Sequence, residues 1–153
     1  MTTVVISGSR RTGNRDQDEF DQIFDYFLSP FTDDEEACVF VGGAVGIDSL
    51  SLTWLVSHTP ARLVIAAPGK VSRQPREAQA AIALAERSGR AQIVELDHPR
   101  FPSTEAYHAR NRWMVDRAQL LIAFPLGDDP KSGTWFTIRY AAEQRKPRLI
   151  VPI

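Results

Sequence analysis

The sequence predicts an α/β fold of three layers, in which a mostly parallel sheet of about six strands carries helices on both faces. Two observations predict it. Short runs of β-branched and other apolar residues alternate with helical patterns along the chain. These runs are apolar throughout rather than alternately apolar and polar, which is typical of parallel strands that are covered on both sides.

Six short apolar runs are the expected strands. They are Thr3–Ser7, Val39–Val41, Leu63–Ala67, Ile93–Leu96, Leu120–Phe124 and Leu149–Val151. Loop-forming residues follow several of them, such as Gly8, Gly42 and Pro68. The strand-to-helix connections therefore contain most of the chain's glycine-rich sequence.

Five helical segments separate these strands. The first has the i, i+3, i+4, i+7, i+8 spacing of an amphipathic helix, through Phe20, Ile23, Phe24, Phe27 and Leu28. We expect Pro30 to end it. The other four are expected from Ile47 to just before Pro60, over Glu77–Arg87 with Gly89 as the stop, over Thr104–Arg117 with Ser103 as the N-cap, and over about Thr134–Arg145.

The bulk composition fits one ordinary domain. The chain has 153 residues, 43% of them hydrophobic and 24% charged, and it shows no internal repeat or linker. We therefore expect a single nucleotide-binding domain over residues 1–153. A lone Cys38, no basic region before an apolar N-terminal run, and no apolar stretch of about 20 residues predict a cytoplasmic protein without a membrane partner.

Charge narrows the choice of partners. The net charge of −1 argues against a surface that is basic all over, as a nucleic-acid coat would be. All 18 basic residues except Lys70, Lys131 and Lys146 are arginine, the residue best suited to bidentate recognition of phosphate. A coding bias toward arginine explains this excess equally well. Position in the fold must therefore decide which arginines matter.

Three glycine-rich loops follow expected strands. The first contains Gly8, Ser9 and Arg10; the second contains Gly42, Gly43, Gly46 and Asp48; the third contains Ser132, Gly133 and Thr134. In parallel sheets, ligands bind outside the carboxyl ends of the strands, where such loops meet. This arrangement makes the predicted fold Rossmann-like.

Glycine loops at helix N-termini expose backbone N–H groups that bind phosphate. The Gly42–Gly46 loop serves this purpose or is simply a tight strand-to-helix turn. It matches neither the G-x-G-x-x-G dinucleotide fingerprint nor a P-loop. Arg10 is the favoured ligand contact of the first loop, whereas Arg11 is equally well explained as a solvated charge.

Three roles are open for Asp48. It binds a ribose hydroxyl, or it orders Arg10, or it caps a helix or pairs with a nearby group, which is the more common role for such a residue. Arg110 and Arg112 project about 200° apart on their helix, so only one of them faces a ligand. Arg139 lies more than a turn inside its helix and is readily explained by salt bridging.

Metal and hydrolase signatures are missing from the sequence. His58, His98 and His108 have no metal-ligand spacing with the single cysteine. No G-x-S-x-G elbow is present. We therefore expect no metal and no cofactor, and no catalytic residue is identified.

Four blocks resemble, in order, motifs of the DprA/Smf DNA-processing proteins. Val5–Thr12 is similar to their first glycine loop, and Gly42–Asp48 is similar to their G-x-A-x-G-I-D loop. Arg110–Arg112 resembles their R-N-R segment. Ser132–Gln144 resembles their S-G-S/T…T-x-R-x-A-x-E-Q stretch. The blocks span nearly the whole chain.

This resemblance implies a Rossmann-like domain of the SLOG superfamily and a single-stranded DNA ligand, since DprA proteins bind single-stranded DNA and help to load a recombinase. The superfamily also holds the LOG-type phosphoribohydrolases. Those enzymes carry P-G-G-x-G-T-x-x-E, whose glutamate assists N-glycosidic hydrolysis. Trp135, Phe136 and Thr137 stand where that acidic residue is expected, which argues against LOG-like hydrolysis.

Three functions remain open. The first is a binding module for a nucleotide or for single-stranded nucleic acid, with a site made of Gly8, Ser9, Arg10, Gly42, Gly43, Gly46, Asp48, Arg110, Ser132, Gly133 and Thr134. The second is a nucleoside-monophosphate N-glycosidase in which Asp48 or another carboxylate assists. The third is a nucleotide sensor or carrier within a homo-oligomer, for which a homodimer is the simplest form.

Overall fold

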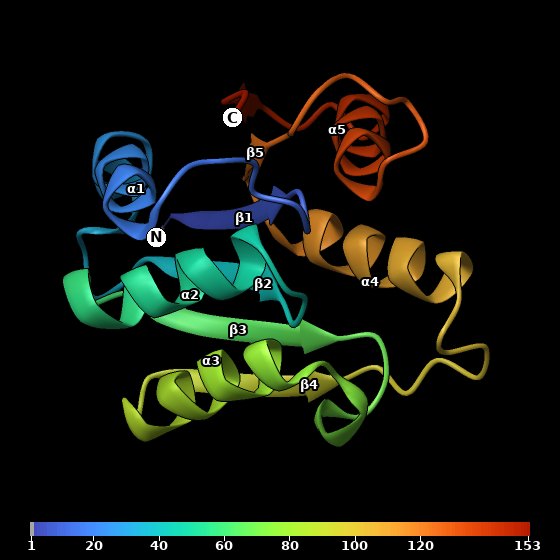
Figure 1. Cartoon of the computed structure of the whole chain (residues 1–153), viewed down its shortest axis with the longest axis horizontal. Helices are drawn as coiled ribbons and strands as arrows, with labels where there is room; N and C mark the ends of the chain where they lie inside the picture. The colour runs from blue at the N-terminus through green and yellow to red at the C-terminus, as the bar shows by residue number, and fades with distance from the viewer. Residues whose placement is uncertain (1) are drawn as a thin grey trace.

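The computed structural model describes residues 2–153 and contains one six-stranded sheet in the order β4-β3-β2-β1-β5-β6 (Figure 1). Its strands are β1 (Thr3–Gly8), β2 (Cys38–Gly42), β3 (Arg62–Ala67), β4 (Ala91–Glu95), β5 (Leu120–Phe124) and β6 (Arg148–Ile150). Every pair of neighbouring strands is parallel. The predicted α/β class and parallel sheet are confirmed.

Helices cover both faces of this sheet. α1 (Gln17–Thr32), α2 (Ile47–His58) and α3 (Arg76–Arg87) pack into one apolar cluster with residues such as Phe24, Leu55 and Ile82. α4 (Thr104–Arg117) and α5 (Gly133–Glu143) pack on the other face through Met114 and Ile138. Figure 1 shows α2 and α3 lying side by side across the sheet. The predicted three layers are therefore present.

The strand order reverses direction at β1. From β1 the chain builds outward through β2, β3 and β4, then returns to place β5 and β6 on the other side of β1. The helix that follows β1 lies on one face, and the helix that follows β5 lies on the opposite face. Connections that diverge in this way leave a crevice at the carboxyl ends of the two strands.

The predicted end of the first helix at Pro30 is wrong, because α1 continues through Pro30 to Thr32. Proline lacks the N–H that bonds the carbonyl of residue 26, but Tyr26 is 75% exposed, so this helix face meets solvent. Thr32 is buried, and its hydroxyl donates to the Leu28 carbonyl at 3.0 Å. Packing of the last turn outweighs the lost hydrogen bond.

The other predicted elements are present, with ends that differ by at most two residues. Ser103 is the N-cap of α4, where its Oγ accepts the Ala106 N–H at 3.1 Å. Gly89 follows α3 with a φ of +74°, as expected for a glycine stop. The 3₁₀ helix η1 (Val71–Arg73) was not predicted. Within residues 2–153, no helix is long and apolar enough to cross a membrane.

Candidate functional site

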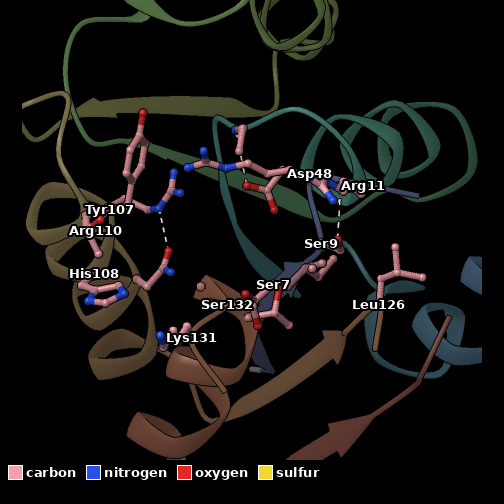
Figure 2. Close-up of a pocket in the computed structure, with 18 of the residues that line it drawn as sticks. Ser7, Ser9, Arg11, Asp48, Tyr107, His108, Arg110, Leu126, Lys131 and Ser132 are labelled. Carbon is pink, nitrogen blue, oxygen red and sulfur yellow. Dashed lines mark hydrogen bonds between the residues drawn. The ribbon is translucent and has the colours of Figure 1, made fainter. Parts of the chain in front are cut away.

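A pocket of about 590 Å³ opens at the carboxyl ends of β1 and β5, beside α4 (Figure 2). This volume lies within the usual range for small-ligand sites. Of the residues predicted for the site, those that line the pocket are Gly8, Ser9, Arg10, Asp48, Arg110, Ser132, Gly133 and Thr134. The structure therefore brings parts of all three predicted loops together.

The glycines of the second loop are placed differently. Among the described residues, Gly42, Gly43 and Gly46 are buried and do not line the pocket. Gly46 has a φ of +76°, and a Cβ on it would lie 2.5 Å from the Arg10 carbonyl oxygen. A Cβ on Gly43 would lie 3.2 Å from Cδ1 of Ile82 on α3. The structure shows close packing at both positions, and their binding of a phosphate stays a prediction.

Gly42 leaves room for two charged side chains in the pocket wall. A Cβ at Gly42 would lie 2.5 Å from Nη1 of Arg110 and 2.6 Å from Oδ2 of Asp48. A larger residue would push these two side chains away. The end of β2 therefore fixes where the guanidinium and the carboxylate lie.

Both of these charged groups are buried and hydrogen-bonded. Arg110 is 4% exposed; its Nε donates to Oδ1 of Asn111 at 2.7 Å, and its Nη1 donates to the Ala66 carbonyl at 3.2 Å. Asp48 is 7% exposed and accepts the Ala44 N–H at 3.3 Å. Such partners are what keep buried polar groups tolerable.

The electrostatic environment of Asp48 shifts its pKa to near neutral pH. Burial raises the pKa of Asp48 to about 7, although Arg110, the Ala44 N–H and Arg10 all act to lower it. Burial likewise lowers the pKa of Arg110, and the nearby Asp48 carboxylate opposes that effect. The charge of the pocket wall therefore changes around pH 7.

The two helix N-termini near the pocket differ in what they offer to an anion. At α2, the Ile47 N–H already donates to the Ser9 carbonyl at 3.0 Å. The first turn of α2 also carries Asp48, an acidic residue of the protein itself. The positive end of α2 is therefore largely used within the chain.

The N-terminus of α5 is more open. Its cap is Ser132, whose Oγ accepts the Trp135 N–H at 3.2 Å. Its first turn contains no Asp or Glu, and a Cβ on the exposed Gly133 would meet no heavy atom of residues 2–153 within 4 Å. Lys131, also exposed, precedes the cap and lines the pocket. Backbone N–H groups, a helix dipole and the Lys131 side chain thus line the same pocket, together with Asp129, whose Oδ1 accepts the Lys131 N–H at 2.9 Å.

Opposite α5, an arginine and an aromatic ring face each other. The Cζ of the exposed Arg10 lies 4.3 Å from the centre of the Tyr107 ring on α4. Arg11 also lines the pocket, and its N–H donates to the Ser9 Oγ at 3.1 Å. Figure 2 shows Tyr107 and Arg110 on one side of the pocket, with Ser9 and Arg11 across from them.

Sequence reasoning missed Tyr107, His108, Asn111 and Lys131, which all line the pocket. Three of them carried a signal, and Asn111 did so as the middle residue of the R-N-R segment. Tyr107 precedes Arg110 by three residues and so shares its helix face. Lys131 directly precedes Ser132, the first predicted site residue of the third loop.

Arg112 and Arg139, whose roles the sequence left undecided, lie outside the pocket. The Cζ of Arg112 lies 5.8 Å from the centre of the Phe136 ring. This agrees with the expectation that the side chains of Arg110 and Arg112 project in different directions from their helix. Arg139 donates from Nη2 to the Pro130 carbonyl at 2.8 Å. Neither is among the described residues that line the pocket.

The family model for DNA recombination-mediator protein A matches residues 1–153. The chain belongs to this family. The resemblance inferred from the four sequence blocks is therefore confirmed. A comparison with curated proteins gives no significant match.

Two solved structures of the family resemble the chain. DNA processing protein A from Helicobacter pylori, described for its single-stranded DNA binding mode, has 21% identity and a TM-score of 0.72. DNA processing protein A (DprA) from Streptococcus pneumoniae has 17% identity and a TM-score of 0.73. The matches cover 99% and 100% of this chain, but only 66% and 51% of those proteins. At these identities, the likeness establishes the shared fold.

Proposed function

We propose that this chain binds single-stranded DNA in the pocket at the carboxyl ends of β1 and β5. The observation that carries the proposal is the convergence of Arg10, Lys131 and the open N-terminus of α5 on that one pocket. Membership of the DNA recombination-mediator family and the single-stranded DNA binding described for the Helicobacter pylori protein support it. We further propose that residues 1–153 form a single domain.

A backbone phosphate binds at the N-terminus of α5. The N–H groups of Gly133 and Thr134 and the hydroxyl of Ser132 are the donors, and Lys131 supplies a full positive charge beside them. Charged hydrogen bonds of this kind are about twice as strong as neutral ones. They recognise phosphate without reading sequence.

A base stacks on Tyr107 in place of Arg10. The contact between an exposed guanidinium and a ring is worth about 0.5–1 kcal/mol. Stacking of a base on an aromatic side chain is worth about 1–3 kcal/mol, so the base displaces the arginine. The released Arg10 then pairs with the phosphate backbone.

The remaining predicted residues support these contacts. Asp48 and Arg110 shape the wall and set its charge. Gly42, Gly43 and Gly46 act through the close packing that their missing side chains allow. Gly8 and Ser9 form the floor of the pocket where β1 ends.

Titration with a labelled oligothymidylate and, separately, with mononucleotides tests the proposal. We expect submillimolar oligonucleotide binding, weakened about five- to tenfold by Lys131→Gln, the change expected when one phosphate contact is lost. Arg87→Gln is the matched control, since it removes an exposed cation at the far end of α3 and should leave affinity unchanged. Absent binding, or equal losses in both variants, would contradict the proposal.

One observation favours a second candidate, a nucleoside-monophosphate N-glycosidase. The Asp48 carboxyl lines the pocket with a pKa of about 7, which suits proton transfer at neutral pH. Release of free base from mononucleotides, abolished by Asp48→Asn, would establish this activity. Mononucleotide binding with neither base release nor oligonucleotide binding would instead favour a sensor or carrier.

A further inference from the structure

A row of aromatic rings and guanidinium groups leads out of the pocket. Inside it, Arg10 faces Tyr107, as described above. The Tyr107 ring meets the Phe101 ring edge-on, with centroids 5.9 Å apart. The Cζ of Arg73 then lies 4.9 Å from the centre of the Phe101 ring. The order Arg10, Tyr107, Phe101, Arg73 crosses from the β1–α1 loop through α4 to η1.

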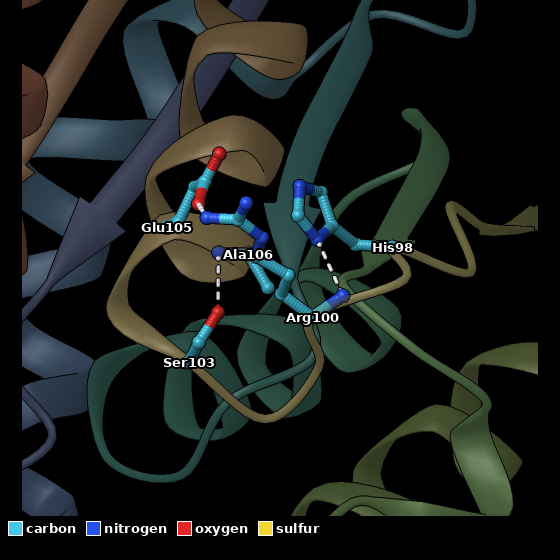
Figure 3. Close-up of polar contacts among 5 residues, drawn as sticks. All are labelled: His98, Arg100, Ser103, Glu105 and Ala106. Carbon is cyan, nitrogen blue, oxygen red and sulfur yellow. Dashed lines mark hydrogen bonds and ion pairs between the residues drawn. The ribbon is translucent and has the colours of Figure 1, made fainter.

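Polar contacts join the loop that contains Phe101 to the start of α4 (Figure 3). Nη1 of Arg100 forms an ion pair with Oε2 of Glu105 at 2.7 Å. The Arg100 N–H donates to Nδ1 of His98 at 3.1 Å, and Ser103 caps the helix through the Ala106 N–H. These contacts hold the Phe101 ring at a defined place beside Tyr107.

Phe101 is also supported from the loop that follows β3. A Cβ on Gly69 would lie 2.5 Å from Cδ1 of Phe101, so glycine is what allows the ring to settle there. The ring nevertheless remains partly exposed. It adjoins the pocket through its contact with Tyr107, but is not among the described residues that line the pocket itself.

The neighbouring segment supplies positive charge. Lys70, Arg73 and Arg76 are exposed within seven residues of sequence, and η1 is held to the sheet by the Val71 N–H, which donates to Oε2 of Glu95 at 2.7 Å. Within residues 2–153, Arg73 forms no ion pair with an acidic side chain. Its guanidinium is therefore available to a phosphate once it leaves the ring.

We propose that Phe101 and Arg73 form a second stacking subsite for single-stranded DNA, adjoining the pocket. The proposal rests on the proposed function and extends it. Each pair of a ring and an arginine accepts one nucleotide: a base replaces the guanidinium on the ring, and the guanidinium moves to the phosphate. The strand leaves the pocket over the 98–103 loop, toward η1 and the β4 edge of the sheet.

This arrangement differs from simple core packing in two ways. The guanidinium of each pair is exposed, so a base displaces it without opening the core. The two pairs also adjoin each other through the Tyr107–Phe101 contact, as successive nucleotides require. Hydrophobic packing of Tyr107 and Phe101 by itself does not require an exposed arginine against each of the two rings.

The test is how binding depends on oligonucleotide length. Affinities of a thymidine dinucleotide and of an oligothymidylate of about eight nucleotides are measured for the wild type and for Phe101→Leu, which keeps an apolar side chain against Gly69 but removes the aromatic face. We expect Phe101→Leu to weaken binding of the longer strand about tenfold and to leave the dinucleotide unchanged. Thermal unfolding of both proteins checks that the variant is folded.

Arg73→Gln is a second variant, at an exposed residue, and its outcome does not depend on how Phe101→Leu folds. It should weaken the longer strand about threefold and reduce the salt dependence of its binding. Unchanged affinity of the longer strand in both variants, while Lys131→Gln weakens it, would overturn the second subsite and leave the proposed function standing. Equal losses for both lengths would also overturn it, since Phe101 would then act on the pocket. A wild type that binds neither strand would refute the proposed function itself.

Discussion

Asp48 and Arg110 lie close together in the pocket wall, where both side chains are largely shielded from water. The sequence indicated both residues, Arg110 through the R-N-R segment and Asp48 through its place after the glycine loop. It did not indicate that they lie together, because that depends on the space left by Gly42 at the end of a third element. The pairing of Arg10 with Tyr107 was likewise hidden, since the two residues are far apart in the sequence.

The raised pKa of Asp48 predicts that DNA binding depends on pH. Above about pH 7 the carboxyl is ionised and repels a phosphate in the pocket; below it the carboxyl is protonated and neutral. Affinity should therefore rise as pH falls from 8 to 6, by about threefold or more. Burial, Arg112 and Arg139 lower the pKa of His108, the histidine that lines the same pocket.

Oligonucleotide titrations at several pH values, with the wild type and with Asp48→Asn, measure this effect. The variant keeps an acceptor for the Ala44 N–H but has no charge to lose. Its affinity should change much less with pH. An identical pH profile in the two proteins would assign the dependence to another group.

At the scale of elements, α2 and α5 both follow loops that the sequence marked as anion sites. The sequence alone gave no reason to rank them, although the acidic residue in the first turn of α2 was visible. The structure separates them, because the Ile47 N–H is bonded to the Ser9 carbonyl while the first turn of α5 opens into the pocket. The end of α1 was also beyond local sequence rules, because tertiary packing extends this helix two residues past Pro30, its expected end.

The difference between the helices predicts a specific effect of Gly133→Asp. A carboxylate at the start of α5 suits the helix dipole and should leave the free energy of unfolding unchanged or raise it by about 0.3–1 kcal/mol. The same carboxylate occupies the proposed phosphate position, so oligonucleotide affinity should fall at least tenfold. Gly133→Asn has similar size without the charge and should lose much less. Equal losses in the two variants would indicate a steric effect instead.

Across the whole molecule, charge is unevenly distributed. Between residues 12 and 61, Arg15 is the only Lys or Arg, whereas ten residues are Asp or Glu. Most of these acids are exposed on α1 and the loop after it, while Arg10, Arg11 and Lys131 line the pocket. The net charge of −1 therefore does not reveal the local group of cations at the pocket, which depends on where each arginine and lysine lies in the fold.

The sequence predicted six parallel strands but not their order. That order creates the site between β1 and β5, and it depends on pairing between strands that are far apart in the sequence.

A small local positive site predicts a shallow salt dependence. Each phosphate contact with a single strand contributes a slope of about −0.7 in a plot of log affinity against log salt concentration. Arg10 and Lys131 together should give a slope of about −1.4 for a short strand. Arg10→Gln should remove about 0.7 of it. A slope that Arg10→Gln leaves unchanged would remove Arg10 from the phosphate contacts.

The proposed function places a DNA phosphate at the N-terminus of α5. A crystal structure of the chain with a short oligothymidylate would show where that phosphate lies. We expect a phosphate that accepts the N–H groups of Gly133 and Thr134, with Lys131 beside it and a base on the Tyr107 ring. A phosphate on the Gly42–Gly46 loop, or a strand bound outside the pocket, would contradict it.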